Sequence, residues 1–302
     1  MTDQTQDQMA PAGGPVKSSE QPDRTGFAKL FYNIGLLRES RVAMIGVAIV
    51  LFWVVVAVFA PALAPYDPNQ SDYAAIMQGP SAEHWLGTDD SGRDILSRIV
   101  FGAQRILSVA PIAMLVAYAV GIALGVLAGY YGGWIDGLVS WIVNIILSFP
   151  LIVLFVVLLS AFGPSAVNVV VAVTAAAAPA IARIVRGLVL DIRNLEYVSA
   201  AQIRGESGLY IMLVELLPNA RGPIIVDACL RMGYTIIAIG VLGFLGLGLP
   251  PPDPDWGGMV SQARALITFK PYMAIFPSIA ISSLVIGFNL LADGLREISL
   301  RD

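Results

Sequence analysis

Asp227 and Arg231 stand four positions apart inside an otherwise apolar stretch of the chain. This spacing brings both side chains to one face of a helix, where they can form an ion pair. An unpaired charge inside a membrane span costs about 2.5 kcal/mol or more, so the two side chains must pair or face water. We expect an internal ion pair near the inner end of the span. The alternative is that both residues line a polar path through the membrane.

Other residue patterns exclude most enzymatic chemistry. The chain has one histidine, His84, and one cysteine, Cys229, which is too few ligands for a catalytic metal cluster and excludes an intrachain disulfide. The lysines, Lys17, Lys29 and Lys270, do not follow a glycine, so a phosphate-binding Gly-x-x-x-x-Gly-Lys-Ser/Thr loop is absent from the sequence. We therefore predict no catalytic residue, no metal site and no cofactor bound by this chain.

The composition predicts an all-α membrane protein. Hydrophobic residues make up 57% of the chain and charged residues 13%, and the mean hydropathy is +0.74. Residues 1–26 are polar and are expected to form a disordered cytoplasmic tail, followed by one transmembrane domain over residues 27–302. Six apolar runs are long enough to be membrane spans, although Pro179 interrupts the short fourth run. They cover residues 42–63, 107–130, 138–162, 165–182, 223–249 and 271–291.

The distribution of Lys and Arg predicts the topology. With six spans both termini lie on one side, and a cytoplasmic N-terminus puts most basic residues inside, as the positive-inside rule requires. The inside set is Lys17, Arg24, Lys29, Arg38, Arg41, Arg183, Arg186, Arg193, Arg204, Arg221, Arg296 and Arg301. The outside set is only Arg93, Arg98, Arg105, Arg264 and Lys270.

The loop between the fourth and fifth spans has the pattern of two short helices. Ala200 and Ala201 favour a helix, Gly205 ends it, and apolar residues between Ile211 and Leu217 give the second helix an apolar stripe. On these residues alone, a helix that rests on lipid headgroups is an equally good interpretation.

The spacing of Ala200-Ala201, Gly205 and Leu217-Pro218 resembles the EAA loop of binding-protein-dependent ABC importers. This resemblance implies a coupling helix that docks in a cleft of a separate ATPase subunit. The loop residues that it implies are Glu196, Ala200, Ala201, Gly205, Glu215, Leu217 and Pro218. Ser199 stands where glutamate is common in that family, and Glu215 stands where related peptide permeases usually carry histidine.

The outer loop before the second span holds a dense polar motif. Thr88 or Asp89 is predicted to cap a helix, and Asp89–Arg93 and Asp94–Arg98 are predicted to pair. A neutralised helix that seals the outer surface and a direct role in substrate binding are equally good interpretations. The segment resembles the motif before the second span of dipeptide, oligopeptide and nickel permeases of the second-subunit type. Its residues are Gly87, Thr88, Asp89, Gly92, Arg93, Asp94 and Arg98.

Two further segments resemble the same permeases. Phe244-Leu245-Gly246-Leu247-Gly248 is similar to the outer end of their fifth span, and Phe288–Arg296 is similar to their last span. Trp256 is expected to be an interfacial anchor. The prolines before Trp256 predict a stiff loop that touches a substrate-binding protein.

The resemblance covers about residues 40–298 and implies an ABC type I importer permease bundle of six transmembrane helices in the bacterial inner membrane. The implied partners are a homologous permease in a heterodimer, two ATPase domains or subunits that bind ATP and Mg²⁺, and a substrate-binding protein. Membrane lipid surrounds the bundle, and no nucleic acid is expected. The chain would form half of the path for a small solute, with di- or oligopeptides as the expected substrates. The alternative is a secondary transporter driven by an ion gradient, which would carry embedded carboxylates on broken helices and paired repeats.

Overall fold

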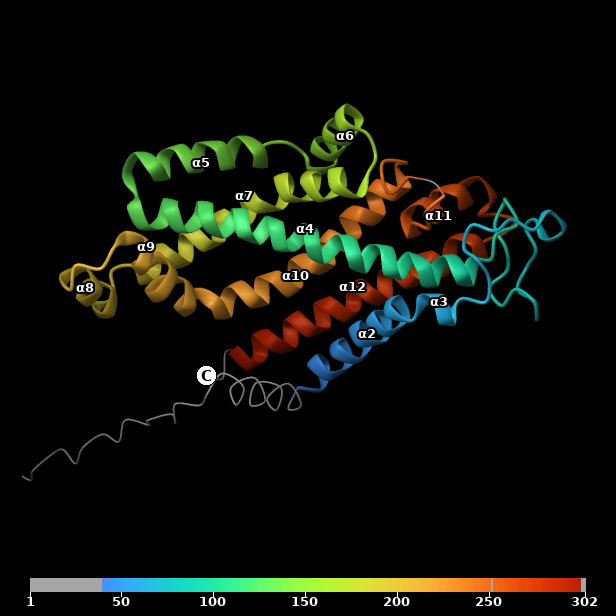
Figure 1. The fold of residues 1–302 in the computed structure, drawn as a ribbon, viewed down its shortest axis with the longest axis horizontal. Helices are drawn as coiled ribbons and strands as arrows, with labels where there is room; N and C mark the ends of the chain where they lie inside the picture. The colour runs from blue at the N-terminus through green and yellow to red at the C-terminus, as the bar shows by residue number, and fades with distance from the viewer. Residues whose placement is uncertain (1–39, 251, 300–302) are drawn as a thin grey trace, which may run out of the picture.

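The structure is a computed structural model that describes residues 40–250 and 252–299. The tail predicted over residues 1–26 lies outside the described residues. Within them the regular elements are helices, apart from one isolated bridge between Thr88 and Asp94. The long helices lie along the longest axis of the molecule (Figure 1). The expected all-α class is confirmed.

The described residues contain five single helices that are long and apolar enough to span a membrane, and a bent pair that makes a sixth candidate span. The single helices are α2 (Arg41–Val58), α4 (Ile95–Tyr131), α7 (Ala166–Ile192), α10 (Leu217–Phe244) and α12 (Tyr272–Ser299). The pair consists of α5 (Gly133–Leu147) and α6 (Leu151–Phe162), which bend by 88° at their junction. Shorter elements are α3 (Ala60–Leu63), η1 (Tyr73–Ala75), α8 (Glu196–Ile203), α9 (Gly208–Tyr210), η2 (Ile211–Leu216), α11 (Trp256–Ala263) and η3 (Arg264–Leu266).

The third predicted span is therefore not one straight helix. Ser148 ends α5, and Pro150 is the residue that precedes α6. Proline has no N–H to donate and disfavours a helical conformation of the residue before it, here Phe149. The chain consequently turns at this point. α6 lies against the end of α7, short of the loop at the end of the bundle opposite α8, while α5 runs alongside α4 (Figure 1).

Other helix ends also differ from the predicted spans. The helix α7 continues through Pro179 to Ile192, so the predicted interruption at Pro179 is wrong. The second span begins at Ile95 because Asp94 caps the helix there. The fifth helix ends at Phe244, before the predicted end at 249. An apolar run shows where lipid contacts begin, whereas a helix continues for as long as its backbone groups and polar side chains are satisfied.

A row of glycines joins α4 to α7. Gly121, Gly125 and Gly129 repeat every four residues and lie on one face of α4 against Ile181, Val185 and Val189 of α7. A Cβ atom at Gly125 would lie 2.7 Å from Val185 Cβ and 2.6 Å from the Ala182 carbonyl oxygen. Small residues at this spacing allow two membrane helices to approach closely.

Trp256 is a buried core residue, so the prediction of an interfacial anchor is wrong. Its side chain is 1% exposed and packs edge-on against Trp53 of α2, with ring centroids 5.0 Å apart. The indole Nε1 donates to the Ile99 carbonyl oxygen of α4 at 3.0 Å. A buried indole needs this acceptor. Trp256 therefore ties the outer loop to the ends of two spans.

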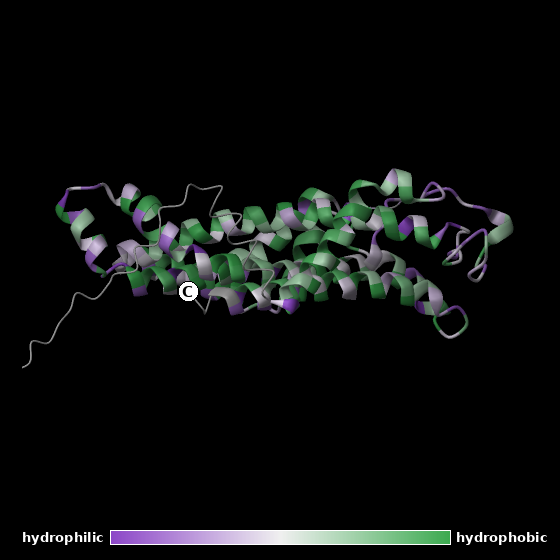
Figure 2. Cartoon of the chain, turned by 90° about the horizontal axis from the view of Figure 1, so that it is seen from below, coloured by the Kyte–Doolittle hydropathy of each residue, from purple (hydrophilic) through white to green (hydrophobic). Residues whose placement is uncertain are grey.

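Polar residues gather at the two ends of the bundle, and hydrophobic residues fill the length between them (Figure 2). One end carries α8, which projects beyond the ends of α4 and α5 (Figure 1). The opposite end carries the loop of residues 64–94, which we call the outer cap after the side on which the distribution of Lys and Arg predicts it. This division is the one expected of a bundle whose middle faces lipid.

Candidate functional site

The projecting helix α8 has one buried face and one exposed face. Val198 and Ala201 are fully buried in a cluster with apolar residues of α7 and η2. Ile203, by contrast, is 88% exposed, and Glu196 and Ala200 are exposed with it. The exposed face of α8 thus combines one large apolar side chain with small and polar ones.

Gly205 ends α8 as predicted. Its φ is +81°, a conformation that residues other than glycine rarely adopt, and its N–H donates to the Gln202 carbonyl oxygen at 3.0 Å. Arg204 then links the segment to the next helix through Glu215, with Nη2 and Oε1 3.3 Å apart. This bridge joins two residues of the predicted coupling loop region, Arg204 and Glu215.

The second short helix of this loop is not a separate element. α9 continues through the π-helical turn η2 into α10, which makes one continuous helix over Gly208–Phe244. Within it Leu217 is half-buried and Pro218 is exposed. Pro218 is the second residue of α10, directly after the π-helical turn η2, so the irregular turn of the continuous helix coincides with the proline. Residues 204–207 therefore connect α8 directly to the start of the long helix that contains α10.

The outer cap is held together by buried charged side chains. The predicted pair Asp89–Arg93 is confirmed, with Oδ2 and Nε 2.7 Å apart. The predicted pair Asp94–Arg98 is wrong. Arg98 instead lies 3.7 Å from Asp89 Oδ2 and donates from Nη1 to the Pro68 carbonyl oxygen at 2.9 Å. Gly87, Thr88, Asp89, Gly92, Asp94 and Arg98 are buried, and Arg93 is half-buried.

Asp94, and not Thr88 or Asp89, caps the second span. Its carboxylate accepts from the Ser97 N–H at 2.7 Å and from His84 Nδ1 at 3.0 Å. Asp94 and His84 therefore both make hydrogen bonds that stabilise the outer cap. Thr88 donates its hydroxyl to the Ala75 carbonyl oxygen within the cap. The contacts favour the interpretation that the motif seals and stiffens the outer end.

Asp255 extends this polar cluster from the other side. It caps α11 through a hydrogen bond from the Gly257 N–H at 3.2 Å, and its carboxylate fits against Gly243 and Gly248. Burial raises the pKa of the Asp255 carboxyl to about 6, although Arg98 opposes that shift. The spacing of residues in the sequence did not identify this carboxyl group, because Asp255 is far from Arg98 along the chain.

We expect the substitution Asp255→Asn to remove a pH dependence of stability. A carboxyl whose pKa is raised in the folded protein binds its proton more tightly there than in the unfolded chain. Wild-type stability should therefore fall as the pH rises from about 4 to about 6, by about 1–3 kcal/mol relative to the Asn variant, and level off above. Thermal unfolding of both proteins in detergent between these pH values measures the difference. If the stability of the two proteins changes with pH in the same way, the raised pKa of Asp255 is wrong.

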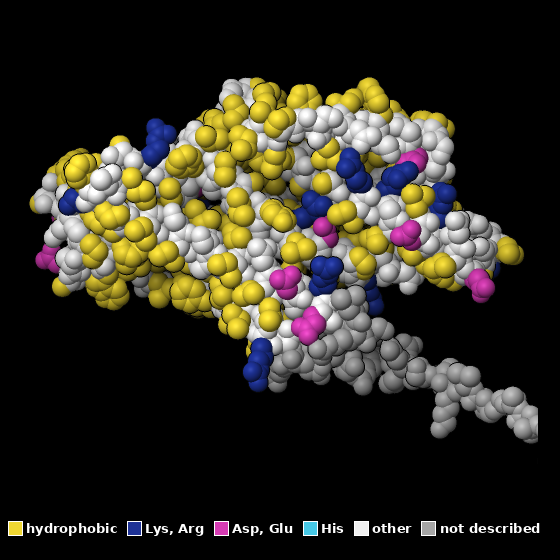
Figure 3. Space-filling model, turned by 180° about the vertical axis from the view of Figure 1, so that it is seen from behind, with side chains coloured by type: hydrophobic (Ala, Val, Ile, Leu, Met, Phe, Trp, Pro, Cys, Tyr) yellow, Lys and Arg dark blue, Asp and Glu magenta, His cyan; other side chains and the backbone are white. Residues whose placement is uncertain are grey.

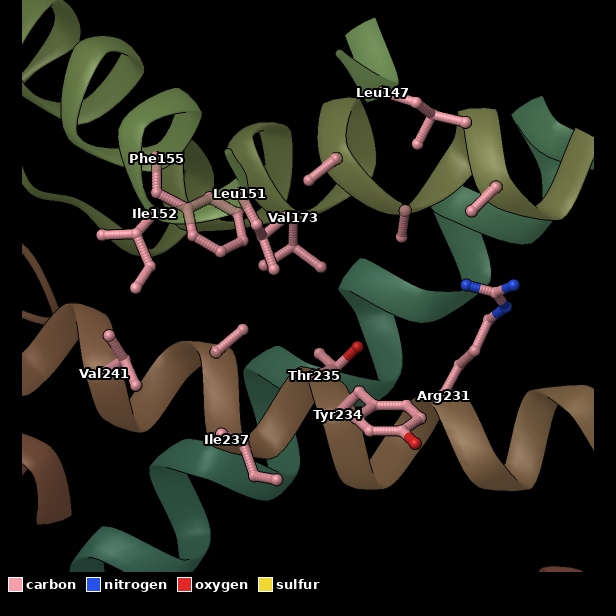
Figure 4. A pocket seen from close by; sticks show the side chains of 14 residues that line it. Leu147, Leu151, Ile152, Phe155, Val173, Arg231, Tyr234, Thr235, Ile237 and Val241 are labelled. Carbon is pink, nitrogen blue, oxygen red and sulfur yellow. The ribbon is translucent and has the colours of Figure 1, made fainter. Parts of the chain in front are cut away.

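A cavity lies between α6, α7 and α10. Its volume is about 460 Å³, and apolar side chains line most of it. Figure 4 shows Leu151, Ile152 and Phe155 at one side and Arg231, with Tyr234 and Thr235, at the other. We call this space the groove cavity. Its size and its mixture of apolar walls with few polar groups are typical of a small-molecule site.

Arg231 and Asp227 form the predicted ion pair, with Nε and Oδ2 2.7 Å apart. The Tyr118 hydroxyl of α4 also donates to Asp227 Oδ2, at 2.5 Å. Asp227 lies nearer to the start of α10 than to its end, and its position near the inner end of the span stays a prediction. The pair is internal, and its arginine also reaches the groove cavity.

Sequence reasoning missed several polar residues near the groove cavity. Tyr118 gave no signal beyond being a polar residue in a span. Asp136 of α5 binds Arg186 of α7 through both carboxylate oxygens, but these residues are fifty positions apart. On the face of the molecule in Figure 3, basic and acidic side chains gather in the half that leads to α8.

A bundle of membrane-spanning helices with a protruding helix at one end and a partly polar cavity between its spans defines a membrane permease. The family model for inner membrane components of binding-protein-dependent transport systems matches residues 121–302. A second model, for the N-terminal transmembrane domain of oligopeptide transport permease C, matches residues 36–80. The chain belongs to the family of binding-protein-dependent transport permeases and is the permease of an ABC importer.

Curated relatives agree with this family. A dipeptide transport system permease protein of Alkalihalophilus pseudofirmus is 41% identical over 261 residues, which covers 86% of each chain. Glutathione transport system permease proteins of Shigella flexneri and Escherichia coli show the same identity and coverage. The family consists of transport components of the inner membrane and not of enzymes. It lends no support to the alternative of an ion-gradient transporter.

A solved structure supports the fold. The MetNI methionine ABC transporter, in an inward-facing conformation, matches with a TM-score of 0.56 and 23% identity. The match covers 69% of this chain and 98% of the matched chain. The expected bundle of an ABC importer permease is therefore confirmed.

Proposed function

We propose that this permease carries di- or oligopeptides and that the groove cavity is part of their path. The observation that carries the proposal is the cavity of about 460 Å³ with Arg231 at one side and apolar walls elsewhere. A peptide has a charged backbone end and side chains that are often apolar. The names of the dipeptide and glutathione permease relatives support the same substrate class.

Asp227 and Arg231 are proposed to face this path as a compensated pair. Because each neutralises the other, the pair adds polarity to the cavity without adding net charge. Tyr118 restrains Asp227 and leaves the guanidinium of Arg231 at the cavity wall. A zwitterionic peptide would meet both signs of charge there.

The exposed face of α8 is proposed as the contact for a separate ATPase. Glu196, Ala200 and Ile203 lie on that face, and Ala201 packs inward. The ATP and Mg²⁺ would be bound by the ATPase. Closure of two ATPase domains would push α8 and thereby the continuous helix that begins at Gly208. Gly205 and the Arg204–Glu215 bridge would stiffen this joint.

The remaining partners follow from the importer type. A homologous permease would complete the path as a heterodimer, and a substrate-binding protein would deliver the peptide to the outer cap. Both termini would be cytoplasmic, because the arginines near α8, including Arg193, Arg204 and Arg221, satisfy the positive-inside rule in that orientation.

We expect uptake of a labelled dipeptide by proteoliposomes that contain the complete importer to require ATP and to persist after the proton gradient is dissipated. Arg231→Ala should reduce that uptake about tenfold, because it leaves Asp227 uncompensated in the path. The charge swap Asp227→Arg with Arg231→Asp keeps the pair and serves as the matched control. Uptake that stops with the proton gradient would contradict the importer mechanism. Wild-type uptake by the Arg231→Ala variant would show that Asp227 and Arg231 do not line the path.

A further inference from the structure

A second cavity lies between α5 and α7, next to the groove cavity along both helices. Its volume is about 230 Å³, and its polar lining residues are Ser140, Asn144, Arg183 and Arg186. Asn144 is three residues from Leu147 on α5, and Arg183 is three residues from Ala180 on α7, where Leu147 and Ala180 line the groove cavity. Residues three apart are neighbours on a helix surface, so the two cavities occupy successive turns of the same helices.

The second cavity lies on the side of the groove cavity that leads to α8. α5 begins at the end of the bundle that carries α8 and runs away from it toward α6 (Figure 1). The second cavity contacts α5 at residues 139–144, and the groove cavity begins at Leu147. A solute that leaves the groove cavity toward α8 would therefore reach the second cavity next.

The two arginines of the second cavity differ in their partners. Arg186 binds Asp136 with Nε and Nη2, at 2.5 and 2.6 Å, in the two-bond geometry that compensates a guanidinium most fully. Arg183 donates from Nη2 to the neutral Asn144 side chain, Oδ1, at 3.0 Å. Among the described residues no carboxylate lies within 4.0 Å of the Arg183 guanidinium.

The second cavity consequently carries one uncompensated positive charge. In the groove cavity Arg231 is neutralised by Asp227, so the net charge of that pair is zero. Arg183 and Asn144 are both exposed, so this guanidinium is accessible to water and to an anion that enters the cavity. Asn144 accepts a hydrogen bond from Arg183 through its oxygen, which leaves its amide N–H groups as donors for the same anion.

We propose that Arg183 and Asn144 form a transient binding site for a carboxylate of the transported solute, which the solute reaches after it leaves the groove cavity. This site rests on the proposed function, because it requires a solute that carries a carboxylate. A guanidinium binds a carboxylate through two parallel N–H···O bonds, and the Asn144 amide adds a neutral donor beside it. The phosphate of an anionic phospholipid is also an oxyanion. The experiment must therefore distinguish a solute carboxylate from a lipid phosphate as the anion that binds Arg183.

The first measurement tests the charge of the second cavity without any transport. Cys229 is the only cysteine, so Cys229→Ala with Ser140→Cys puts one thiol into the lining of this cavity. A negatively charged thiosulfonate reagent should modify that thiol faster than a positively charged one of similar size. Adding Arg183→Gln should lower this rate ratio about tenfold, and Arg183→Lys should preserve it. An unchanged ratio in the Gln variant would overturn the site.

The second measurement tests the identity of the anion. In proteoliposomes with the complete importer, Arg183→Gln should reduce dipeptide uptake about tenfold, and Arg183→Lys should keep most of it. The loss should be the same in liposomes of phosphatidylcholine alone and in liposomes that also contain phosphatidylglycerol. A loss of uptake confined to liposomes with phosphatidylglycerol would mean that the bound oxyanion belongs to lipid. Equal losses of uptake in the Gln and Lys variants would mean that the shape of the arginine side chain matters and its charge does not. Either result overturns the proposal.

The two measurements also separate this site from the proposed function. The wild-type importer could take up no peptide while the ratio of reagent rates still depends on Arg183. In that case the proposed peptide substrate is wrong, and the anion that binds Arg183 is not a peptide carboxylate. If peptide uptake is ATP-dependent while the Gln variant behaves as wild type in both assays, only the Arg183 site fails.

Discussion

Gly125→Leu is expected to prevent the bundle from forming. Gly125 is the central residue of the glycine row on α4, and even a single Cβ atom there would lie 2.6 Å from the Ala182 carbonyl oxygen of α7. The carbonyl oxygen belongs to the helix backbone, so it cannot move aside as a flexible side chain does. The steric clash can be avoided only if α4 and α7 move apart. Overpacking of a tight core costs about 1–3 kcal/mol, and a leucine at a backbone contact should exceed the upper value.

The measurement is the amount of monodisperse protein after extraction from membranes in detergent, together with its thermal unfolding. The matched control is Gly137→Leu on α5, because a Cβ atom at Gly137 would meet no atom within 4 Å. Gly125→Leu should yield little folded protein, and Gly137→Leu should resemble the wild type. Equal yields and equal unfolding temperatures would mean that the close approach of α4 and α7 does not hold the bundle together.

Gly205→Pro is expected to abolish transport while ATP hydrolysis by the partner continues. Proline holds φ near about −65° and has no N–H, whereas Gly205 has φ +81° and donates to the Gln202 carbonyl oxygen. The substitution therefore removes the end of α8 and the stiff connection to the helix that begins at Gly208. A coupling helix without a stiff connection moves with the ATPase and does not move the span. Uptake should fall at least about tenfold.

The control is Gly205→Asn, because asparagine tolerates a positive φ and keeps the N–H. The ratio of dipeptide taken up to ATP hydrolysed in proteoliposomes distinguishes the variants. This ratio should be close to wild type for Asn and should collapse for Pro. A Pro variant that hydrolyses ATP and transports at the wild-type ratio would show that this segment does not transmit the movement of the ATPase.

The two substitutions probe different levels of the molecule. Gly125 acts where two spans touch along their length, so its replacement affects folding. Gly205 is exposed and has no neighbour within 4 Å of a would-be Cβ atom, so its replacement leaves the core untouched. A folded but uncoupled Gly205→Pro protein is thus the expected result.

Features that depend on local spacing were predicted well. The apolar runs located the spans, and the spacing of four predicted the pairs Asp227–Arg231 and Asp89–Arg93. The end of α8 at Gly205 follows from the intrinsic preference of one residue. Spans were less accurate at their ends, because Asp94 extends α4 and Gly246, with φ +75°, follows the end of α10.

By itself the sequence determined that this is an all-α membrane protein of the permease class, with a short helix that ends at Gly205 and an internal ion pair at Asp227. The helix end and the ion pair depend on residues within a few positions of one another, the all-α membrane class depends on composition and apolar runs, and the permease class depends on the resemblance of motifs along the chain. Only the tertiary structure decided that Arg98 faces Asp89, that Trp256 is buried, and that Arg186 is compensated while Arg183 is not. These contacts depend on how far each helix is rotated and where Pro150 bends the chain, and spacing along one helix carries no information about its neighbours.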